Sequence, residues 1–435
     1  MNRRCNAMTL LCSLCLMIIL VTPGEAQEVK RTELDNGLVL LTKPVTANNI
    51  VSVVVALKMG SLYESDEEAG LSTLMQDTII KGTKTRTSEQ IALDIESMGT
   101  RLGSSSNREY GTLTLQSTSE SFDKSLEILY DIILNPTFPD DAVELQKKLQ
   151  VRNILMQRDQ PIYRAIELLV EAHFGEHPFH KPRMGYPETV MKLTREELLK
   201  VYKETYVPNN MVVCVVGNFE EKKLLESISG TLGSLPHSNK PEKMTGEVVK
   251  KQEPVEKTET KDTAANWFAL GWESPELDDR DYYAMEVLDS ITGGSMNSRL
   301  FVELREKRGL AYQVSSFVNA RMDAGIYVAY IGTKPSSYDE AKSLLLKEVR
   351  RMGTESASDE ELTNARNFLK GMNIMGMESN AGQASQYAHN EIVDVGYDFV
   401  ERYNKQIDAI TADDVLRVGK KYLNGNYAMG GVLAK

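Results

Sequence analysis

The chain has 435 residues, 41% of them hydrophobic, and it carries a formal net charge of −12 at pH 7. This length is enough for two domains with substantial cores. The acidic balance disfavours a nucleic-acid role, because phosphate binding needs basic surfaces.

The first 26 residues have the pattern of a secretory signal peptide. Two arginines precede an apolar run from Met8 to Val21, and a small-residue cleavage site ends at Ala26. Three of the four cysteines fall within this segment, so the mature chain keeps only Cys214 and forms no internal disulfide. No later apolar run reaches transmembrane length, so we expect an exported protein that is free of the membrane after cleavage.

The segment from Gly70 to Thr83 predicts a short amphipathic helix. Its apolar residues fit one helical face, and Lys81 followed by Gly82 is typical of a helix end. The segment resembles the zinc helix of the insulinase, pitrilysin and mitochondrial processing peptidase family, whose pattern is Gly-Leu-Ala-His-x-x-Glu-His followed by an apolar run and Lys-Gly-Thr.

In that register the metal-binding and catalytic positions have lost their chemistry. Thr73 and Asp77 stand at the two histidine positions, and Gln76 stands at the position of the catalytic glutamate. The third zinc ligand of the family, a glutamate on a later helix, aligns with Asn153. Since an inverted zinc motif needs two imidazoles and a general base, we expect a core-packing helix and no metal in this chain. A hard-cation site built from Asp77, Gln76 and Asn153 is the alternative.

The segment from Arg101 to Tyr110 corresponds, by the same resemblance, to the edge strand on which peptide substrates of the family add through main-chain hydrogen bonds. The usual Asn-Ala pair of the family appears here as Gly103-Ser104, followed by Ser105. These three residues are candidates for peptide binding. A solvent-exposed hairpin edge without a ligand is the alternative.

Two blocks of similar sequence pattern indicate an internal duplication around a charged linker. The linker, residues 236–263, is rich in Lys, Glu, Thr and Pro, and this composition predicts a solvated segment. Thr194 and Thr411 lie 217 residues apart, and each is a credible helix N-cap with an acidic residue three positions later.

The predicted strands and helices segregate more than they alternate, which favours an α+β fold with mainly antiparallel sheets over a doubly wound fold. The resemblance covers nearly the whole mature chain and implies two homologous α+β domains, residues 27–235 and 264–435, that face each other across a chamber. The strand candidates are Gly37–Lys43, Ile50–Met59, Gly111–Ser117, Met211–Phe219, Ala265–Trp272, Ala311–Val318 and Gly325–Ile331.

The segment from Gly293 to Tyr312 is similar to a second family motif, a glycine-rich loop and helix followed by an arginine and a tyrosine that face the zinc site. Here the pair is Arg305 and Tyr312. A guanidinium and a phenolic hydroxyl in a closed chamber can stabilise the negative charge that develops on a scissile carbonyl oxygen. The alternative needs no function: a glycine loop begins a helix and Gly309 ends it.

The histidines give a weak signal. His173, His177 and His180 are close in sequence, but Gly175 and Pro178 interrupt the helix that would align them, so no metal site is predicted there. His389 is expected at the surface of a polar helix. Cys214 lies in a continuous apolar strand, where we expect a buried thiol.

Two classes of function follow from these patterns. In two-subunit relatives of the family, one subunit carries the zinc helix and the other supplies the arginine and tyrosine, and this chain resembles the second kind. It would then be the zinc-less subunit of a metallopeptidase in the bacterial periplasm, with no cofactor of its own, peptide substrates, and a homologous partner that holds the zinc. The alternative is a catalytically inactive peptide-binding or structural subunit of the same fold. Retention of both Arg305 and Tyr312 favours the first.

Overall fold

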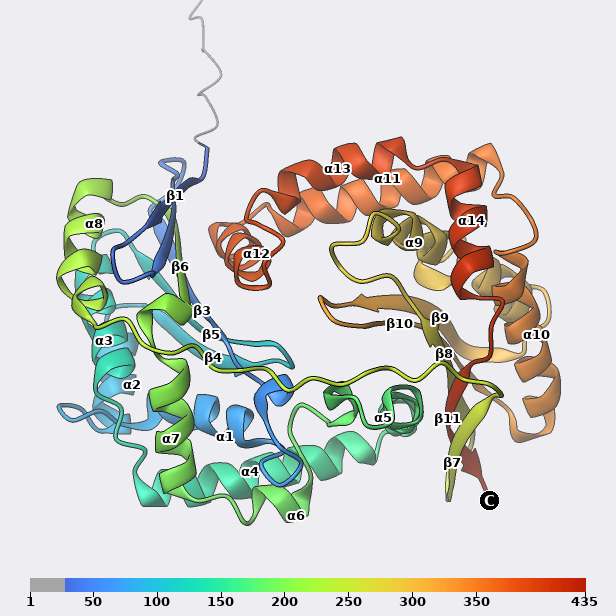
Figure 1. Cartoon of the computed structure of the whole chain (residues 1–435), viewed down its shortest axis with the longest axis horizontal. Helices are drawn as coiled ribbons and strands as arrows, with labels where there is room; N and C mark the ends of the chain where they lie inside the picture. The colour runs from blue at the N-terminus through green and yellow to red at the C-terminus, as the bar shows by residue number, and fades with distance from the viewer. Residues whose placement is uncertain (1–27) are drawn as a thin grey trace, which may run out of the picture.

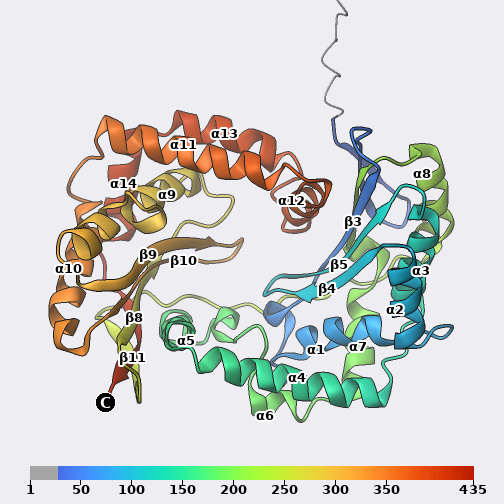
Figure 2. The same ribbon diagram turned by 180° about the vertical axis from the view of Figure 1, so that it is seen from behind.

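The computed structural model describes residues 28–435, so the predicted signal peptide lies outside the described residues. The described chain forms two halves, each with one β-sheet and its covering helices, and the halves stand opposite each other (Figure 1). The view from behind shows the same two-part arrangement (Figure 2). The α+β class predicted from the sequence is confirmed. Among the described helices, none combines the length and the apolar character needed to cross a membrane.

The sheet of the first half has six strands in the order β1-β2-β6-β3-β5-β4. β2 and β6 run parallel, and the other neighbouring pairs are antiparallel. Every residue of β6 is buried, which explains its unbroken apolar sequence. The bounds are β1 (Lys30–Glu33), β2 (Val39–Pro44), β3 (Ile50–Lys58), β4 (Arg101–Ser106), β5 (Tyr110–Thr118) and β6 (Met211–Gly217).

The sheet of the second half repeats this topology in the order β7-β11-β8-β10-β9, with β7 and β11 as its parallel pair. These five strands correspond in order and direction to β2-β6-β3-β5-β4 of the first sheet. The duplication inferred from the sequence is therefore present in the fold. The bounds are β7 (Val255–Lys261), β8 (Asn266–Glu273), β9 (Ala311–Ala320), β10 (Gly325–Thr333) and β11 (Ala428–Ala434).

Helices begin at the capping residues that the sequence predicted. Thr194 accepts a hydrogen bond from the amide of Glu197, and Thr411 accepts one from the amide of Asp414, each within a complete capping box. The first half has α1 (Leu71–Thr78), α2 (Ser88–Ser97), α3 (Phe122–Leu134), α4 (Asp140–Arg158), α5 (Pro161–Phe174), α6 (Pro187–Val190), α7 (Arg195–Thr205) and α8 (Glu221–Gly230). The second half has α9 (Tyr282–Asp289), α10 (Tyr338–Arg351), α11 (Asp359–Gly376), α12 (Asn380–Ile392), α13 (Phe399–Ala409) and α14 (Ala412–Tyr422).

The end of α1 differs from the prediction. The α-helix stops at Thr78, and a 3-10 turn carries the chain on to Lys81. Gly82 has a φ of 161°, which is extended backbone, so it does not cap the helix in the left-handed conformation. The chain enters a short antiparallel bridge between Gly82 and Thr87 instead.

The predicted charged linker is only partly irregular. Residues 236–254 contain no helix or strand, but residues 255–261 form β7 at the edge of the second sheet. The segment predicted as a solvated linker up to residue 263 therefore includes a strand, most of whose residues are exposed. Alternating Glu, Lys and Thr side chains on an edge strand keep other chains from pairing with it, and that polar composition concealed the strand in the sequence.

Each sheet is covered on one face by a helix from the opposite half. α12 of the second half packs on β3 and β6, and α5 of the first half packs on β8 and β11 (Figure 1). Tyr387 and Ala388 of α12 share an apolar core with Cys214 of β6. Leu169 of α5 shares another with Ala428 of β11. Each of the two sequence ranges predicted as domains has a core of its own, and the two ranges also share these two apolar clusters.

The approach of α5 to β11 leaves room only for glycine. A Cβ atom at Gly430 would overlap the carbonyl oxygen of Ala165 and the amide nitrogen of Leu169. Both are backbone atoms, which cannot rotate aside. A larger residue at position 430 must therefore displace the helix as a whole.

We expect Gly430→Ala to lower the free energy of unfolding by about 1–3 kcal/mol, because overpacking pushes α5 away from β11. Urea unfolding of the mature chain measures the loss. Gly431→Ala is the matched control in the same strand, since its Cβ would meet nothing closer than the Thr258 methyl group at 3.2 Å. Equal losses for the two variants would contradict the close approach of α5.

Candidate functional site

The first turn of α1 is held by a buried carboxylate. Glu64 accepts hydrogen bonds from the amides of Gly70 (2.8 Å) and Ser72 (2.6 Å), a favourable place for negative charge because a helix N-terminus is partially positive. Lys181, 2% exposed, donates to the carbonyl oxygen of Glu64 at 2.7 Å. Burial raises the pKa of Glu64, and the hydrogen bonds from Ser72 and Gly70 oppose that shift. Sequence reasoning missed Glu64 and Lys181, because nothing in their local sequence marks them.

Two of the three degenerate positions on α1 are tied into the scaffold. The Thr73 hydroxyl donates to the carbonyl oxygen of Arg183 at 2.8 Å. Gln76 is fully buried, donates through Nε2 to the carbonyl oxygen of Thr112, and accepts from the Tyr206 hydroxyl, both at 2.9 Å. In the family that this chain resembles, these two positions belong to the zinc site. Here their side chains make structural hydrogen bonds instead.

Asp77 is the only ionisable residue among the three α1 positions. It is half-buried, and burial raises its pKa against the opposing positive charges of Arg183 and Lys81. One carboxylate cannot supply the three protein ligands of a catalytic zinc site. Across residues 28–435, no group of three His, Cys, Asp or Glu side chains is arranged to hold a metal ion. The residues present do not fit zinc.

Asn153 does not belong to this cluster. It is exposed on α4, and the residue of α4 that reaches α1 is Gln150, which donates to the carbonyl oxygen of Gly70 at 3.0 Å. The buried residues of α4 are Val143, Lys147, Gln150 and Ile154. Helical periodicity therefore puts Asn153 away from the buried face of α4.

The purified mature chain is expected to retain no stoichiometric zinc after dialysis, as measured by elemental analysis. The combined changes Thr73→His, Gln76→Glu, Asp77→His and Asn153→Glu should also leave it metal-free, because residue 153 lies on the exposed side of α4. One tightly held zinc ion per chain in either protein would overturn this geometry.

The predicted peptide-binding segment forms the edge of the first sheet. β4 is the last strand in the sheet order, so within residues 28–435 no other strand pairs with its outer side. Ser104 donates through its hydroxyl to the carbonyl oxygen of Gln76, and the hydroxyl of Ser105 lies 2.9 Å from that of Thr112. A Cβ at Gly103 would come within 2.6 Å of the Thr114 hydroxyl oxygen. These side chains are engaged within the protein, and what β4 leaves open is its main chain.

Arg305 and Tyr312 lie on either side of a tight turn in the second half. Arg305 belongs to a π-helical segment, Phe301–Glu306, and Tyr312 lies near the start of β9. The amide of Leu310 donates to the carbonyl oxygen of Leu304 at 2.8 Å, which folds the intervening chain back on itself. Gly309 has a φ of 61°, so it ends the helical segment in the left-handed conformation.

Both side chains are exposed. Tyr312 is 54% exposed, and the guanidinium of Arg305 lies 5.2 Å from the ring centroid of Phe301. Lys307 and Arg308 each pair with Glu303 at 2.6 Å, whereas within the described residues Arg305 has no carboxylate partner. The α1 residues and the β9 residues belong to opposite halves of the molecule (Figure 1).

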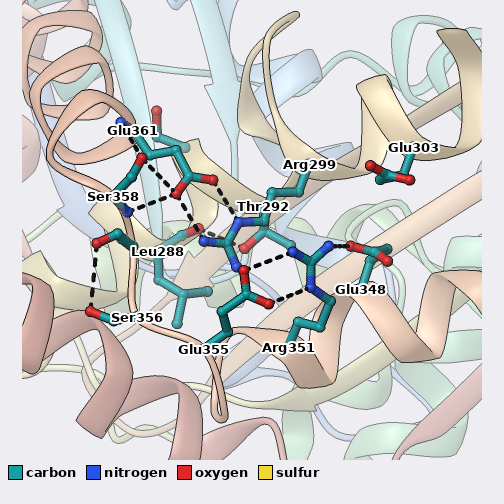
Figure 3. A network of polar contacts seen from close by, with 12 residues as sticks. Leu288, Thr292, Arg299, Glu303, Glu348, Arg351, Glu355, Ser356, Ser358 and Glu361 are labelled. Carbon is teal, nitrogen blue, oxygen red and sulfur yellow. Dashed lines mark hydrogen bonds and ion pairs between the residues drawn. The ribbon is translucent and has the colours of Figure 1, made fainter. Parts of the chain in front are cut away.

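A partly buried ion pair holds Arg299, which lies between the glycine-rich loop and Arg305. Arg299, 8% exposed, donates to the two carboxylate oxygens of Glu361 at 2.6 and 2.9 Å (Figure 3). Glu361 also accepts from the amide of Ser358 at 2.9 Å and completes the capping box of α11. The hydrogen bonds from Arg299 lower the pKa of Glu361 to about 2. In the same network, Arg351 bridges Glu348 and Glu355 (Figure 3).

We expect Glu361→Gln to lower the free energy of unfolding at pH 7 by about 1–3 kcal/mol. Because the folded pKa lies below the unfolded value of roughly 4.3, the stabilisation is complete above that value and is lost as the pH falls through 2. The difference from wild type in urea unfolding should therefore narrow between pH 4.5 and pH 2. Glu360→Gln, at the exposed neighbouring residue, is the control and should change little; a pH-independent difference for Glu361→Gln would refute the ion-pair account.

The environment of one histidine differs from the prediction. His389 of α12 is half-buried, with its ring centroid 4.8 Å from that of Tyr110, so it is less exposed than the predicted surface position. Burial and the positive charge of Arg321 lower the pKa of His389 to about 4. His173 and His177 pack against Phe174, at centroid distances of 4.8 and 5.7 Å, instead of converging on one point.

Cys214 is fully buried, as predicted, in the core between the first sheet and α12. Burial raises the pKa of its thiol, so the reactive thiolate is disfavoured. The residue therefore packs as a small apolar side chain.

Comparison with known proteins finds relatives that share this fold. A family model described as insulinase (peptidase family M16) matches residues 39–186, and one described as the peptidase M16 inactive domain matches residues 192–369. A protein of Rickettsia felis described as an uncharacterized zinc protease is 28% identical over 391 residues, covering 90% of this chain and 94% of the relative. One of Bacillus subtilis with the same description is 25% identical over 402 residues, covering 92% and 97%. A peptidase M16 inactive domain from Pseudomonas fluorescens has the same fold, with a TM-score of 0.87 at 19% identity over 94% of this chain and 98% of that one. So does a protease from Helicobacter pylori, with a TM-score of 0.83 at 20% identity over 94% and 100%. The chain belongs to the insulinase family, peptidase family M16.

Proposed function

We propose that this chain is the metal-free subunit of a heteromeric periplasmic metallopeptidase, and that it presents Arg305 and Tyr312 to the zinc site of a homologous partner. The main support is a contrast between two sets of side chains. Thr73 and Gln76 on α1 are committed to hydrogen bonds within the scaffold. Arg305 and Tyr312 are exposed at the surface of the second half, where a substrate can reach them.

The chemistry of the pair suits peptide hydrolysis. A guanidinium and a phenolic hydroxyl both donate hydrogen bonds, and both stabilise the negative charge that develops on a scissile carbonyl oxygen. Glu303 is occupied by Lys307 and Arg308, so it does not neutralise Arg305. The ion pair of Arg299 with Glu361 fixes the preceding loop, so that less reorganisation is needed when substrate binds. The partner's zinc would activate the attacking water.

A second candidate is a catalytically inactive subunit that binds peptides. The open main-chain edge of β4 supports it, because an extended peptide can add there as a further strand. In this case Arg305 and Tyr312 would have no share in turnover. The two candidates therefore differ in what the loss of that pair does to an assembled complex.

If the first candidate is right, Arg305→Ala or Tyr312→Phe should lower turnover by the complex with the zinc-bearing homologue, while the complex still assembles. Loss of one preorganised donor to a developing oxyanion costs on the order of 10²-fold to 10³-fold in rate. Peptide turnover by the reconstituted complex, with assembly checked by size-exclusion chromatography, measures the effect.

Lys307→Ala is the matched control, because Lys307 belongs to the same turn and is already paired with Glu303. It should leave turnover nearly unchanged. Full activity of an assembled complex that carries both Arg305→Ala and Tyr312→Phe would exclude the catalytic contribution and leave the peptide-binding candidate.

A further inference from the structure

A cavity next to α1 is lined by more positive than negative charge. It lies between α4, α5 and the loop of residues 180–185, and its volume is about 170 Å³. A cavity holds a water molecule once it offers roughly 10–15 Å³, so this one has room for a small polar group and its stem. Its ionisable lining residues include Arg108, Arg158, Arg183, Glu167 and His180.

The only carboxylate in this lining is already compensated. Glu167 pairs with Arg158 at 2.6 Å and with Arg164, outside the lining, at 3.0 Å. His180 faces Asp66 at 3.7 Å, and Asp66 also lies 3.5 Å from Lys181. The carboxylate of the lining therefore does not neutralise the positive charges of Arg108 and Arg183.

Arg108 and Arg183 bond only to backbone carbonyl groups within the described residues. Arg108 donates to the carbonyl oxygens of Phe179 and Lys181, the latter at 2.6 Å. Arg183 donates to the carbonyl oxygen of Ser106 at 2.9 Å. Carbonyl groups satisfy some of the N–H donors but do not neutralise the charge.

The other arginines near Arg108 add to the positive excess. Burial and the positive charges of Arg321 and Arg183 lower the pKa of Arg108 to about 9. Arg321 is itself ion-paired with Glu109 at 2.5 Å. The carboxylate of Asp77 on α1 attracts Arg183 electrostatically, although the two groups are too far apart to form an ion pair. An anion in the cavity would relieve the repulsion between the arginines.

The cavity adjoins the end of the open edge strand. Ser106, the residue that accepts from Arg183, is the last residue of β4, and Arg108 follows it in the turn to β5. A peptide paired with the open edge of β4 would therefore end, or place a side chain, beside these arginines. The apolar lining residues Ile154, Ile166 and Val170 suit the stem of such a side chain.

We propose that this cavity binds a carboxylate group of a peptide, with Arg183 and Arg108 as its counter-ions. The planar guanidinium group matches a carboxylate in shape and charge, and charge-assisted hydrogen bonds between them are the stronger kind. The carboxylate can come from the peptide's C-terminus or from an acidic side chain. Such a site rests on the peptide-binding part of the proposed function and holds whether or not Arg305 and Tyr312 serve a partner.

Three peptides test the site on the purified mature chain without a partner: N-acetyl-tetraalanine with a free C-terminal carboxylate, its C-terminal amide, and the amide of N-acetyl-Ala-Glu-Ala-Ala. Ligand-detected NMR titration at pH 7 gives each Kd. We expect at least one carboxylate peptide to bind roughly 10-fold to 100-fold more tightly than the neutral amide. Preference for the first peptide identifies the C-terminus as the source, and preference for the third identifies the side chain.

Arg183→Gln should abolish this preference, and Arg101→Gln should keep it. Arg101 is the matched control, because it is an exposed arginine at the opposite end of β4. Circular dichroism melting confirms that the variants fold, and the comparison of peptides on the wild-type chain needs no variant. Equal affinity for the neutral amide, an unchanged preference in Arg183→Gln, or tighter binding of inorganic phosphate than of either carboxylate peptide would each overturn the proposal.

Discussion

The exchange of α5 and α12 between the halves is the contact on which the rest of the structure depends. Without α12, the face of β6 that carries Val212, Cys214 and Val216 would lie open to water. Burial of one large apolar side chain stabilises by about 1.5–3 kcal/mol, and each exchanged helix buries several. Separation of the halves would expose both faces at once, so residues 236–254 connect the halves without acting as a hinge between them.

This arrangement explains how the metal positions can change without loss of the fold. α1 needs buried partners for its polar side chains, because an unpaired buried polar group is costly. Gln76 keeps roughly the shape of a glutamate, pairs with Thr112 and Tyr206, and brings no charge into the core. The Thr73 hydroxyl donates a hydrogen bond to the carbonyl oxygen of Arg183. The helix is therefore stable without a metal ion, and the nearby positive charge comes from arginine side chains.

Local patterns in the sequence predicted the elements well, and long-range contacts explain the failures. Capping boxes at Thr194 and Thr411 involve residues three positions apart, so they are visible in the sequence. β7 was missed because its residues are those of a solvated segment, and only its pairing with β11 makes it a strand. The sequence did not show that Asn153 is exposed, because a frame transferred along a helix does not fix which residue faces inward. His389 is partly covered by Tyr110, which lies 279 positions earlier in the sequence.

The two halves share a topology but carry different chemistry at equivalent edges. β4 and β9 occupy the same place in their sheets; β4 ends beside Arg183 and Arg108, and β9 begins beside Arg305. The chain as a whole has a net charge of −12, which repels acidic ligands at long range, so the attraction of these arginines acts only at short range. Salt screens exposed charges beyond about 8–10 Å under physiological conditions. Selection of a carboxylate by this protein is therefore a matter of local fit, set by guanidinium groups held in place by the scaffold.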